Sequence, residues 1–225
     1  MKKSKQFLAV ASLLICFLAI SLQPAKAQVE VSLQLFYDDL SPYGSWVYSP
    51  QYGNVWVPEA GPGFRPYFSG GHWVYTENGW LWASTYDWGW APFHYGTWVM
   101  DHHHGWMWVP GYEWAPAQVT WGYYSGYYGW APLGPGISYS TSYYPAMDHW
   151  VFMEPGYMTV QGGWGNHYYV ARNNRIVFNN NVSINVVKNI RVVENTGDYH
   201  GRKFSAGPRR EEFRSEEHTS ELQSL

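Results

Sequence analysis

The sequence predicts an all-β fold, an antiparallel meander of tryptophan-rich β-hairpin repeats that curves into a barrel-like or blade-like sheet. A Gly-x-Trp-Val unit occurs three times, and a glycine-containing turn signal follows each copy. All fifteen tryptophans lie between Trp46 and Trp164, a density far above ordinary globular usage. No stretch has a helical period over enough residues to predict a helix.

The three repeats share a spacing as well as a motif. They begin at Gly44, Gly71 and Gly96, and their second tryptophans, Trp56, Trp82 and Trp108, are 26 residues apart. In the second repeat, Asn78-Gly79 predicts a two-residue turn that pairs Tyr75 with Trp82. One extra loop residue in the other two repeats then places Tyr48 opposite Trp56 and Met100 opposite Trp108. Every predicted hairpin therefore gathers its tryptophans on one face.

Proline and asparagine mark the elements that follow the hairpins. Trp-Ala-Pro occurs at 90–92, 114–116 and 130–132, and we expect it to end strands because proline cannot donate to a ladder. Beyond 138 the repeat fades into a Ser/Tyr-rich connector (139–144). Residues 176–178, 182–186 and 190–192 alternate apolar with polar side chains, which predicts two or three further short strands. From residue 196 onward, glycine and basic residues predict disorder.

The two ends of the chain differ from the body. Residues 1–27 predict a cleaved signal peptide, with a basic start, an apolar run over 7–22 and an Ala25-Lys26-Ala27 cleavage signature. Cys16, the single cysteine, would leave with it. Residues 214–225 resemble the in-frame translation of a sequencing-library adapter. We therefore expect a tryptophan-rich repeat domain (28–137), a connector with Asn-rich strands (138–195) and a basic disordered extension (196–213). The mature chain would lie in the periplasm, at the cell surface or outside the cell.

The distribution of charge along the sequence limits the partners that the protein can bind. Residues 28–171 contain one cationic side chain, Arg65, against ten acids, a formal charge of −9, whereas residues 172–213 sum to +4. Nucleic-acid binding needs clustered Lys and Arg, so we exclude nucleic-acid partners. We also do not expect an integral membrane protein. A polysaccharide or another envelope protein fits this composition better.

We predict no catalytic centre and no cofactor. The acidic residues are scattered one per loop, whereas a glycoside hydrolase needs two carboxyls flanking one bond. A glycan-active hydrolase therefore stays only an alternative. His102, His103 and His104 beside Asp101 resemble metal ligands, but the predicted register puts them at a loop tip, so we interpret them as solvated rather than as a metal site. We interpret His94, among aromatic neighbours, as a buried histidine bonded to backbone.

The surplus of aromatic rings is the remaining candidate for function. One thin sheet cannot hide fifteen tryptophans, so some rings should line a ligand-binding surface. Trp80, Trp88, Trp106 and Trp121 lie outside the repeated core positions, and we predict them as exposed platforms for polysaccharide or a surface partner. The alternative is a structural scaffold in which every aromatic ring belongs to the core.

Several strings of the sequence together resemble a known family. They are 36–44 (FYDDLSPYG), 71–74 (GHWV), 88–96 (WGWAPFHYG), 108–116 (WVPGYEWAP) and 129–135 (GWAPLGP). They are similar to a tryptophan-rich, secreted bacterial domain of unknown function found in Gram-negative envelopes, over about residues 35–139. The resemblance implies an exported envelope protein and supplies no activity.

Overall fold

A computed structural model describes residues 31–124, 126–137, 145–159, 168–172, 175–178, 182–185, 191–192, 196–199 and 201–211. The predicted signal peptide, the Ser/Tyr-rich connector and the adapter-like residues lie outside these ranges. Contacts divide the chain into residues 1–31 and 32–225, and the second of these units contains all the elements below.

A short helix, which the sequence did not predict, begins the described fold. Helix α2 spans Leu33–Leu40, and the Ser32 hydroxyl caps it by accepting a hydrogen bond from Leu35 N at 3.2 Å. The 3₁₀ turn η1 (Ser41–Tyr43) follows it. Eight residues are too few to show a helical period, and α2 is held instead by its cap and by the burial of Phe36 and Leu40.

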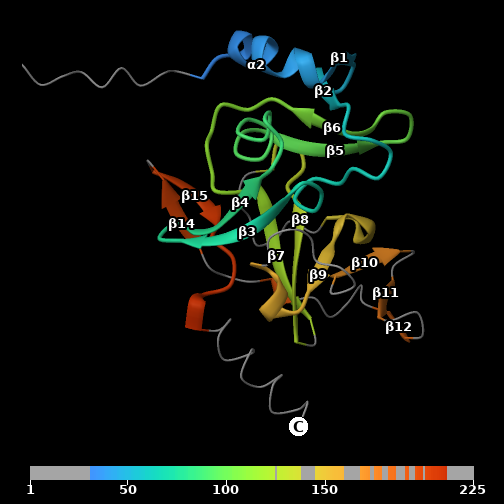
Figure 1. Ribbon diagram of the computed structural model, residues 1–225, viewed down its shortest axis with the longest axis vertical. Coiled ribbons are helices and arrows are strands. Elements are labelled where there is room, and N and C mark those ends of the chain that lie inside the picture. Colours follow the sequence, from blue (N-terminus) through green and yellow to red (C-terminus); the bar gives the residue numbers. More distant parts are fainter. Residues whose placement is uncertain are drawn as a thin grey trace, which may run out of the picture. The chain divides into compact units, whose positions relative to one another are not determined.

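The predicted hairpins all form, but they do not make one continuous meander (Figure 1). The first is β1 (Gly44–Ser49) with β2 (Gly53–Pro58), the second β3 (Gly71–Thr76) with β4 (Gly79–Ser84), and the third β5 (Thr97–Asp101) with β6 (Gly105–Val109). The first and third join as a sheet of order β1-β2-β6-β5, in which Trp56 pairs with Trp108. The second stays a separate two-stranded sheet, reached through a loop with prolines at 62 and 66 that cannot extend a ladder.

The predicted register is wrong by two residues in every hairpin. Tyr75 pairs with Trp80 rather than Trp82, and the other hairpins shift in the same way, to Tyr48↔Asn54 and Met100↔Trp106. A two-residue type I′ turn needs positive φ at both central positions, yet only Gly79 has it (φ 92°) and Asn78 does not. Gly79 is therefore the first residue of β4 rather than the last residue of the turn. Because a shift of two preserves the side-chain face, the tryptophans still share one face.

A seven-stranded sheet follows, of order β12-β11-β10-β9-β8-β7-β13. Its strands are β7 (Val119–Tyr124), β8 (Tyr127–Pro132), β9 (Val151–Met153), β10 (Tyr168–Arg172), β11 (Arg175–Phe178), β12 (Val182–Asn185) and β13 (Arg191–Val192). The 3₁₀ turns η2 (Met147–His149) and η3 (Pro155–Tyr157) flank β9. Strands β11 to β13 confirm the short strands predicted after the repeat. Among the described strands, neither of the two larger sheets closes on itself.

The prediction of disorder from residue 196 is wrong over the described residues. Strands β14 (Thr196–Tyr199) and β15 (Arg202–Ser205) form an antiparallel hairpin that lies beside β3 and β4 (Figure 1). The Asp198 carboxylate accepts a hydrogen bond from Gly201 N at 2.9 Å, and Gly201 has positive φ. The acid thus satisfies a backbone donor inside the turn, which stabilises the hairpin despite its polar composition.

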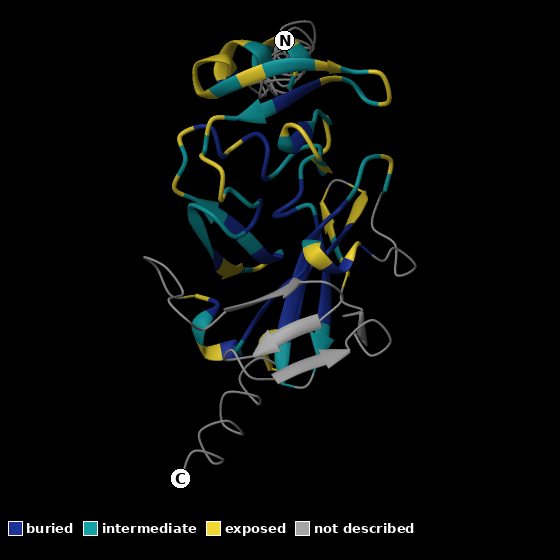
Figure 2. Cartoon of the chain, turned by 90° about the vertical axis from the view of Figure 1, so that its right-hand side faces the viewer, coloured by how far each residue is buried: buried dark blue, intermediate teal, exposed yellow. Residues whose placement is uncertain are grey.

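The core is built from aromatic rings whose polar atoms bond to backbone. The Tyr67 hydroxyl donates to Phe93 O at 3.1 Å and accepts from Gln118 N, while Trp130 Nε1 donates to Tyr67 O at 2.7 Å. Burial raises the pKa of Tyr67 well above its usual value. Figure 2 shows the buried residues following the inner strands and loops, and the exposed ones the outer turns. Within the described chain, no helix is long and apolar enough to cross a membrane.

Candidate functional site

The four rings predicted to be exposed platforms are buried, so that prediction is wrong. Trp80, Trp88, Trp106 and Trp121 are 2%, 5%, 5% and 0% exposed. Trp88 stacks on Tyr86 at 4.4 Å between ring centroids, and Trp106 lies 4.8 Å from the His149 ring. Residues 206–208 pack against β4 and the indoles of Trp80 and Trp121. A place outside the repeated core tryptophan positions therefore did not mean exposure, because other rings and, for Trp80 and Trp121, a distant segment cover these side chains.

The histidine cluster lies at the tip of the β5–β6 turn, and its acid is engaged in the turn itself. The Asp101 carboxylate accepts hydrogen bonds from the backbone N–H of His103 and of His104 and contacts His104 Nδ1, each at 2.9 Å. These backbone donors lower the pKa of Asp101 to about 2. In the part of the chain that the structure describes, no group of three His, Cys, Asp or Glu side chains is placed to hold a metal ion.

Five other aromatic side chains are partly or largely exposed, and their ring contacts form two groups. We call them the aromatic row: Trp90, Tyr95, Tyr112, Trp114 and Tyr199. Trp90 (37% exposed) and Tyr112 (57%) both pack on the buried Phe36 ring, at 5.9 and 6.3 Å between centroids. Trp90 also lies 6.4 Å from Tyr95.

The C-terminal hairpin supplies the other end of the row. The Tyr199 ring lies 4.6 Å from Trp114. Burial raises the pKa of Tyr95, and the nearby Tyr199 phenol raises it further. The row therefore consists of a group of rings at Phe36 and the Trp114–Tyr199 pair, and the electrostatic effect of Tyr199 on Tyr95 relates the two.

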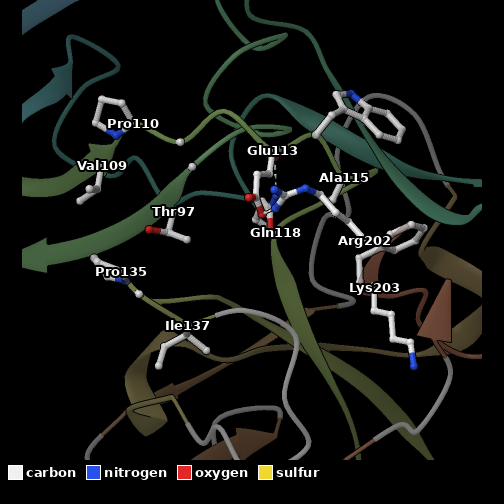
Figure 3. A pocket seen from close by; sticks show the side chains of 15 residues that line it. Thr97, Val109, Pro110, Glu113, Ala115, Gln118, Pro135, Ile137, Arg202 and Lys203 are labelled. Atoms are coloured by element: carbon white, nitrogen blue, oxygen red, sulfur yellow. Dashed lines mark hydrogen bonds and ion pairs between the residues drawn. The ribbon is translucent and has the colours of Figure 1, made fainter. Parts of the chain in front are cut away.

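A cavity of about 220 Å³ borders the row, with walls of different character. Figure 3 shows Thr97, Val109, Pro135 and Ile137 on one side, facing the polar side chains of Glu113, Gln118 and Arg202. The Arg202 guanidinium forms an ion pair with the Glu113 carboxylate. The Lys203 side chain points away from this ion pair (Figure 3). We call this cavity the Glu113–Arg202 pocket.

His94 holds the loop that presents Glu113. Its Nδ1 lies 3.1 Å from Ala115 O, and its own carbonyl accepts from Ala115 N at 2.9 Å. Because a carbonyl only accepts, neutral His94 carries its proton on Nδ1. Burial lowers the pKa of His94, which favours that neutral form. The prediction of a histidine bonded to backbone is confirmed.

Gln118 completes the support of this loop by donating from Nε2 to Glu113 O at 3.0 Å. Sequence reasoning missed the pocket because Arg202 and Lys203 come from the extension predicted to be disordered. One signal for this hairpin was present, namely the spacing of Asp198 and Gly201 just before an apolar residue, Phe204.

No curated protein and no solved structure matches the chain. Residues 37–137 match a family described as a family of unknown function, DUF6600, close to the 35–139 expected from the sequence strings and without the C-terminal hairpin.

Proposed function

We propose that the chain is an exported, non-catalytic binding protein of the bacterial cell envelope that holds a polysaccharide along the aromatic row and one sugar unit in the Glu113–Arg202 pocket. The observation that carries this proposal is that Trp114 of the aromatic row also lines a pocket with both aliphatic and polar side chains. The rings lie elsewhere than the four tryptophans first predicted, but the chemistry expected of them is the same.

The two walls suit the two sides of a sugar. The C–H groups of a pyranose face pack well on aromatic and aliphatic surface, because the faces of aromatic rings are electron-rich. The hydroxyl groups need donors and acceptors, which Glu113, Gln118 and Arg202 supply. A volume of about 220 Å³ is below the roughly 300–1,000 Å³ of pockets that enclose a drug-sized ligand, so it suits one unit of a longer chain.

The charge of the pocket favours a carboxylated sugar. Residues 28–171 are strongly acidic, but β15 brings Arg202 and Lys203 to a pocket where Glu113 is the single acid among the described lining residues. A uronate carboxylate would share the Arg202 guanidinium with Glu113. We therefore expect uronate polymers to bind more tightly than neutral ones.

Non-catalytic binding suits this pocket better than hydrolysis. A glycosidase uses two carboxyls about 5–10 Å apart, one of which donates a proton. Here Glu113 is paired with Arg202, and no second acid is among the described lining residues. A pocket of this kind can orient a sugar without activating the glycosidic bond.

One observation favours a second candidate function, a scaffold that binds no glycan. Trp80, Trp88, Trp106 and Trp121 all belong to the core, as a purely structural use of tryptophan requires. The scaffold hypothesis predicts that the accessible rings are dispensable.

The test is a fluorescence titration of residues 28–213 with alginate, polygalacturonate and a neutral β-glucan. Arg202→Gln should weaken uronate binding about tenfold or more, the scale of one lost charge-assisted contact. Tyr112→Ala should weaken it roughly threefold to tenfold, the scale of one lost ring contact. Tyr48→Ala is the matched control, since Tyr48 is 74% exposed on β1 and outside the aromatic row. A flat response to all three polymers would favour the scaffold.

A further inference from the structure

A short segment that begins in the second half of β15 is completely buried. We call Phe204–Pro208 the latch. All five residues are buried, although the chain on either side of them is exposed. Complete burial of a short segment without regular structure beyond Ser205 requires a complementary surface, which we call the seat, on the rest of the fold.

Strand β4 provides that seat through its main chain and through one indole. Trp80 N donates to Ala206 O at 3.0 Å, and Trp80 Nε1 donates to Pro208 O at 2.9 Å. Ala206 lies directly against Gly79, where an added Cβ atom would come within 2.7 Å of the Ala206 Cβ. The latch therefore contacts the edge of β4 through one main-chain hydrogen bond and one indole hydrogen bond.

Gly207 lies between the two indoles at the centre of the seat. A Cβ atom placed on it would lie 2.6 Å from Trp80 Cδ1 and 2.8 Å from Trp121 Cε2, and its φ is 78°. Both the space and the backbone conformation require glycine. Gly207 therefore fits the space and the backbone conformation of the docked latch.

The latch continues directly from the strand that forms one wall of the pocket. Arg202, Lys203 and Phe204 of β15 line the pocket, and Tyr199 of β14 ends the aromatic row. The other contacts of this hairpin are weaker anchors: Arg202 and Glu113 are 52% and 56% exposed, and exposed ion pairs stabilise little. The position of this wall therefore depends on the latch.

We propose that the latch is a reversible clasp that positions the C-terminal wall of the Glu113–Arg202 pocket, so that the site is complete only while Phe204–Pro208 is docked on Trp80 and Trp121. This inference rests on the proposed function for its ligand, but the docking itself can be tested without one. Upstream, β13 pairs with β7 at Val192↔Gly122, so an undocked hairpin stays tethered to the sheet.

One feature of the seat favours reversibility. The indole N–H of Trp121 is buried and has no hydrogen-bond partner among the described residues. A buried donor without an acceptor weakens the docked state relative to an open state in which water reaches it. A ligand that contacts both Glu113 and β15 binds the docked state more tightly than the open state. Its binding would therefore shift the latch toward the docked state.

The test is amide hydrogen exchange of the full chain, comparing two neighbouring amides of β4. Trp80 N bonds to Ala206 O of the latch, whereas Trp82 N bonds to Pro116 O outside it, at 3.2 Å. In Gly207→Ala we expect exchange at Trp80 to rise by about tenfold or more while exchange at Trp82 is unchanged. Gly126→Ala is the matched control, because Gly126 also has positive φ but no neighbour within 4 Å.

Equal acceleration at both amides, or none at Trp80, would overturn the clasp. If Gly207→Ala does not fold, Trp80→Phe tests the same point, because it deletes the bond to Pro208 O and part of the indole on which the latch is docked. The Trp114 indole resonance should also shift in both variants as Tyr199 moves away, and an unmoved resonance would contradict the positioning role.

Alginate binding separates the two hypotheses. Affinity lost by about tenfold in Gly207→Ala and kept in Gly126→Ala supports the clasp, because residue 207 does not line the pocket. Unchanged affinity with an open latch would refute the positioning role and leave the binding function intact. If the wild-type chain binds no glycan, the proposed function fails. The difference in amide exchange between Trp80 and Trp82 and the shift of the Trp114 resonance then still show whether the latch holds the β14–β15 hairpin in place.

Discussion

The indole N–H of Trp80 donates a 2.9 Å hydrogen bond to the carbonyl of Pro208, joining residues 128 positions apart. The bond is buried, and it connects β4 of the second hairpin to a segment outside residues 37–137. Trp80 is therefore not a surface platform. Its nonpolar ring belongs to the core, and its polar atom fixes a distant part of the chain.

Trp80→Phe should lower the free energy of unfolding by about 2–3 kcal/mol, since it removes this hydrogen bond and part of a buried indole ring. Urea denaturation measures the change. Trp98→Phe is the control, because Trp98 Nε1 of β5 donates at the same distance to Pro92 O, in the loop just before that strand. Both variants should lose similar stability, and only Trp80→Phe should accelerate exchange at the Trp80 amide.

Trp56→Ala should cost about 3–5 kcal/mol, the usual loss for truncating a buried large aromatic. Trp56 is fully buried, pairs with Trp108 between the first and third hairpins, and donates to Leu40 O at 3.1 Å. Trp90→Ala should change stability far less, as Trp90 is 37% exposed. Comparable losses in chemical denaturation would contradict the assignment of Trp56 to the core.

Gly129→Ala should destabilise the seven-stranded sheet by about 1–3 kcal/mol through overpacking. A Cβ atom at Gly129 would overlap the ring of Phe152, which is fully buried on the neighbouring strand β9. Gly156→Ala provides the comparison, since no atom lies within 4 Å of a Cβ there. Thermal unfolding of the two variants should differ by several degrees.

Stability should depend on pH through His94. Burial lowers its folded pKa below the ordinary 6.5, so the unfolded chain binds a proton more readily than the folded one. The contribution of neutral His94 to the free energy of unfolding is fully present above about pH 6.5, and it is lost as the pH falls toward the folded pKa. Burial also lowers the pKa of His149. His94→Asn should reduce the slope of unfolding free energy against pH below 6.5, and an unchanged slope would contradict this origin.

Asp101→Asn should loosen the β5–β6 turn. The ionised carboxylate accepts two backbone N–H bonds, and its folded pKa is about 2, below the ordinary 3.8. This stabilisation is fully present above about pH 4 and is lost as pH falls through 2. Amide exchange at His103 and His104 should accelerate in the variant at pH 6. The difference from wild type should shrink near pH 2, and a difference independent of pH would show that charge is not the cause.

The sequence by itself determined the all-β hairpin class, the strands after the repeat and the face shared by the tryptophans. These features depend on local rules, because turn glycines and the two-residue period of a strand act between near neighbours. A register error of two residues left the faces unchanged for the same reason. The match of residues 37–137 agrees with the strings that indicated the family.

Only the tertiary structure decided which rings are exposed and where the candidate site lies. Burial of Trp80 and Trp121 depends on residues 204–208, and the pocket wall at Glu113 depends on Arg202, both contacts between segments about ninety or more positions apart. Composition predicted disorder there, since the hairpin β14–β15 has few apolar residues of its own. It is ordered because Phe204 and Ala206 bury against Ala115 and against the edge of β4, surface that belongs to another part of the chain. Long-range burial of this kind has no periodic signal in the sequence, which is why the site could not be read from it.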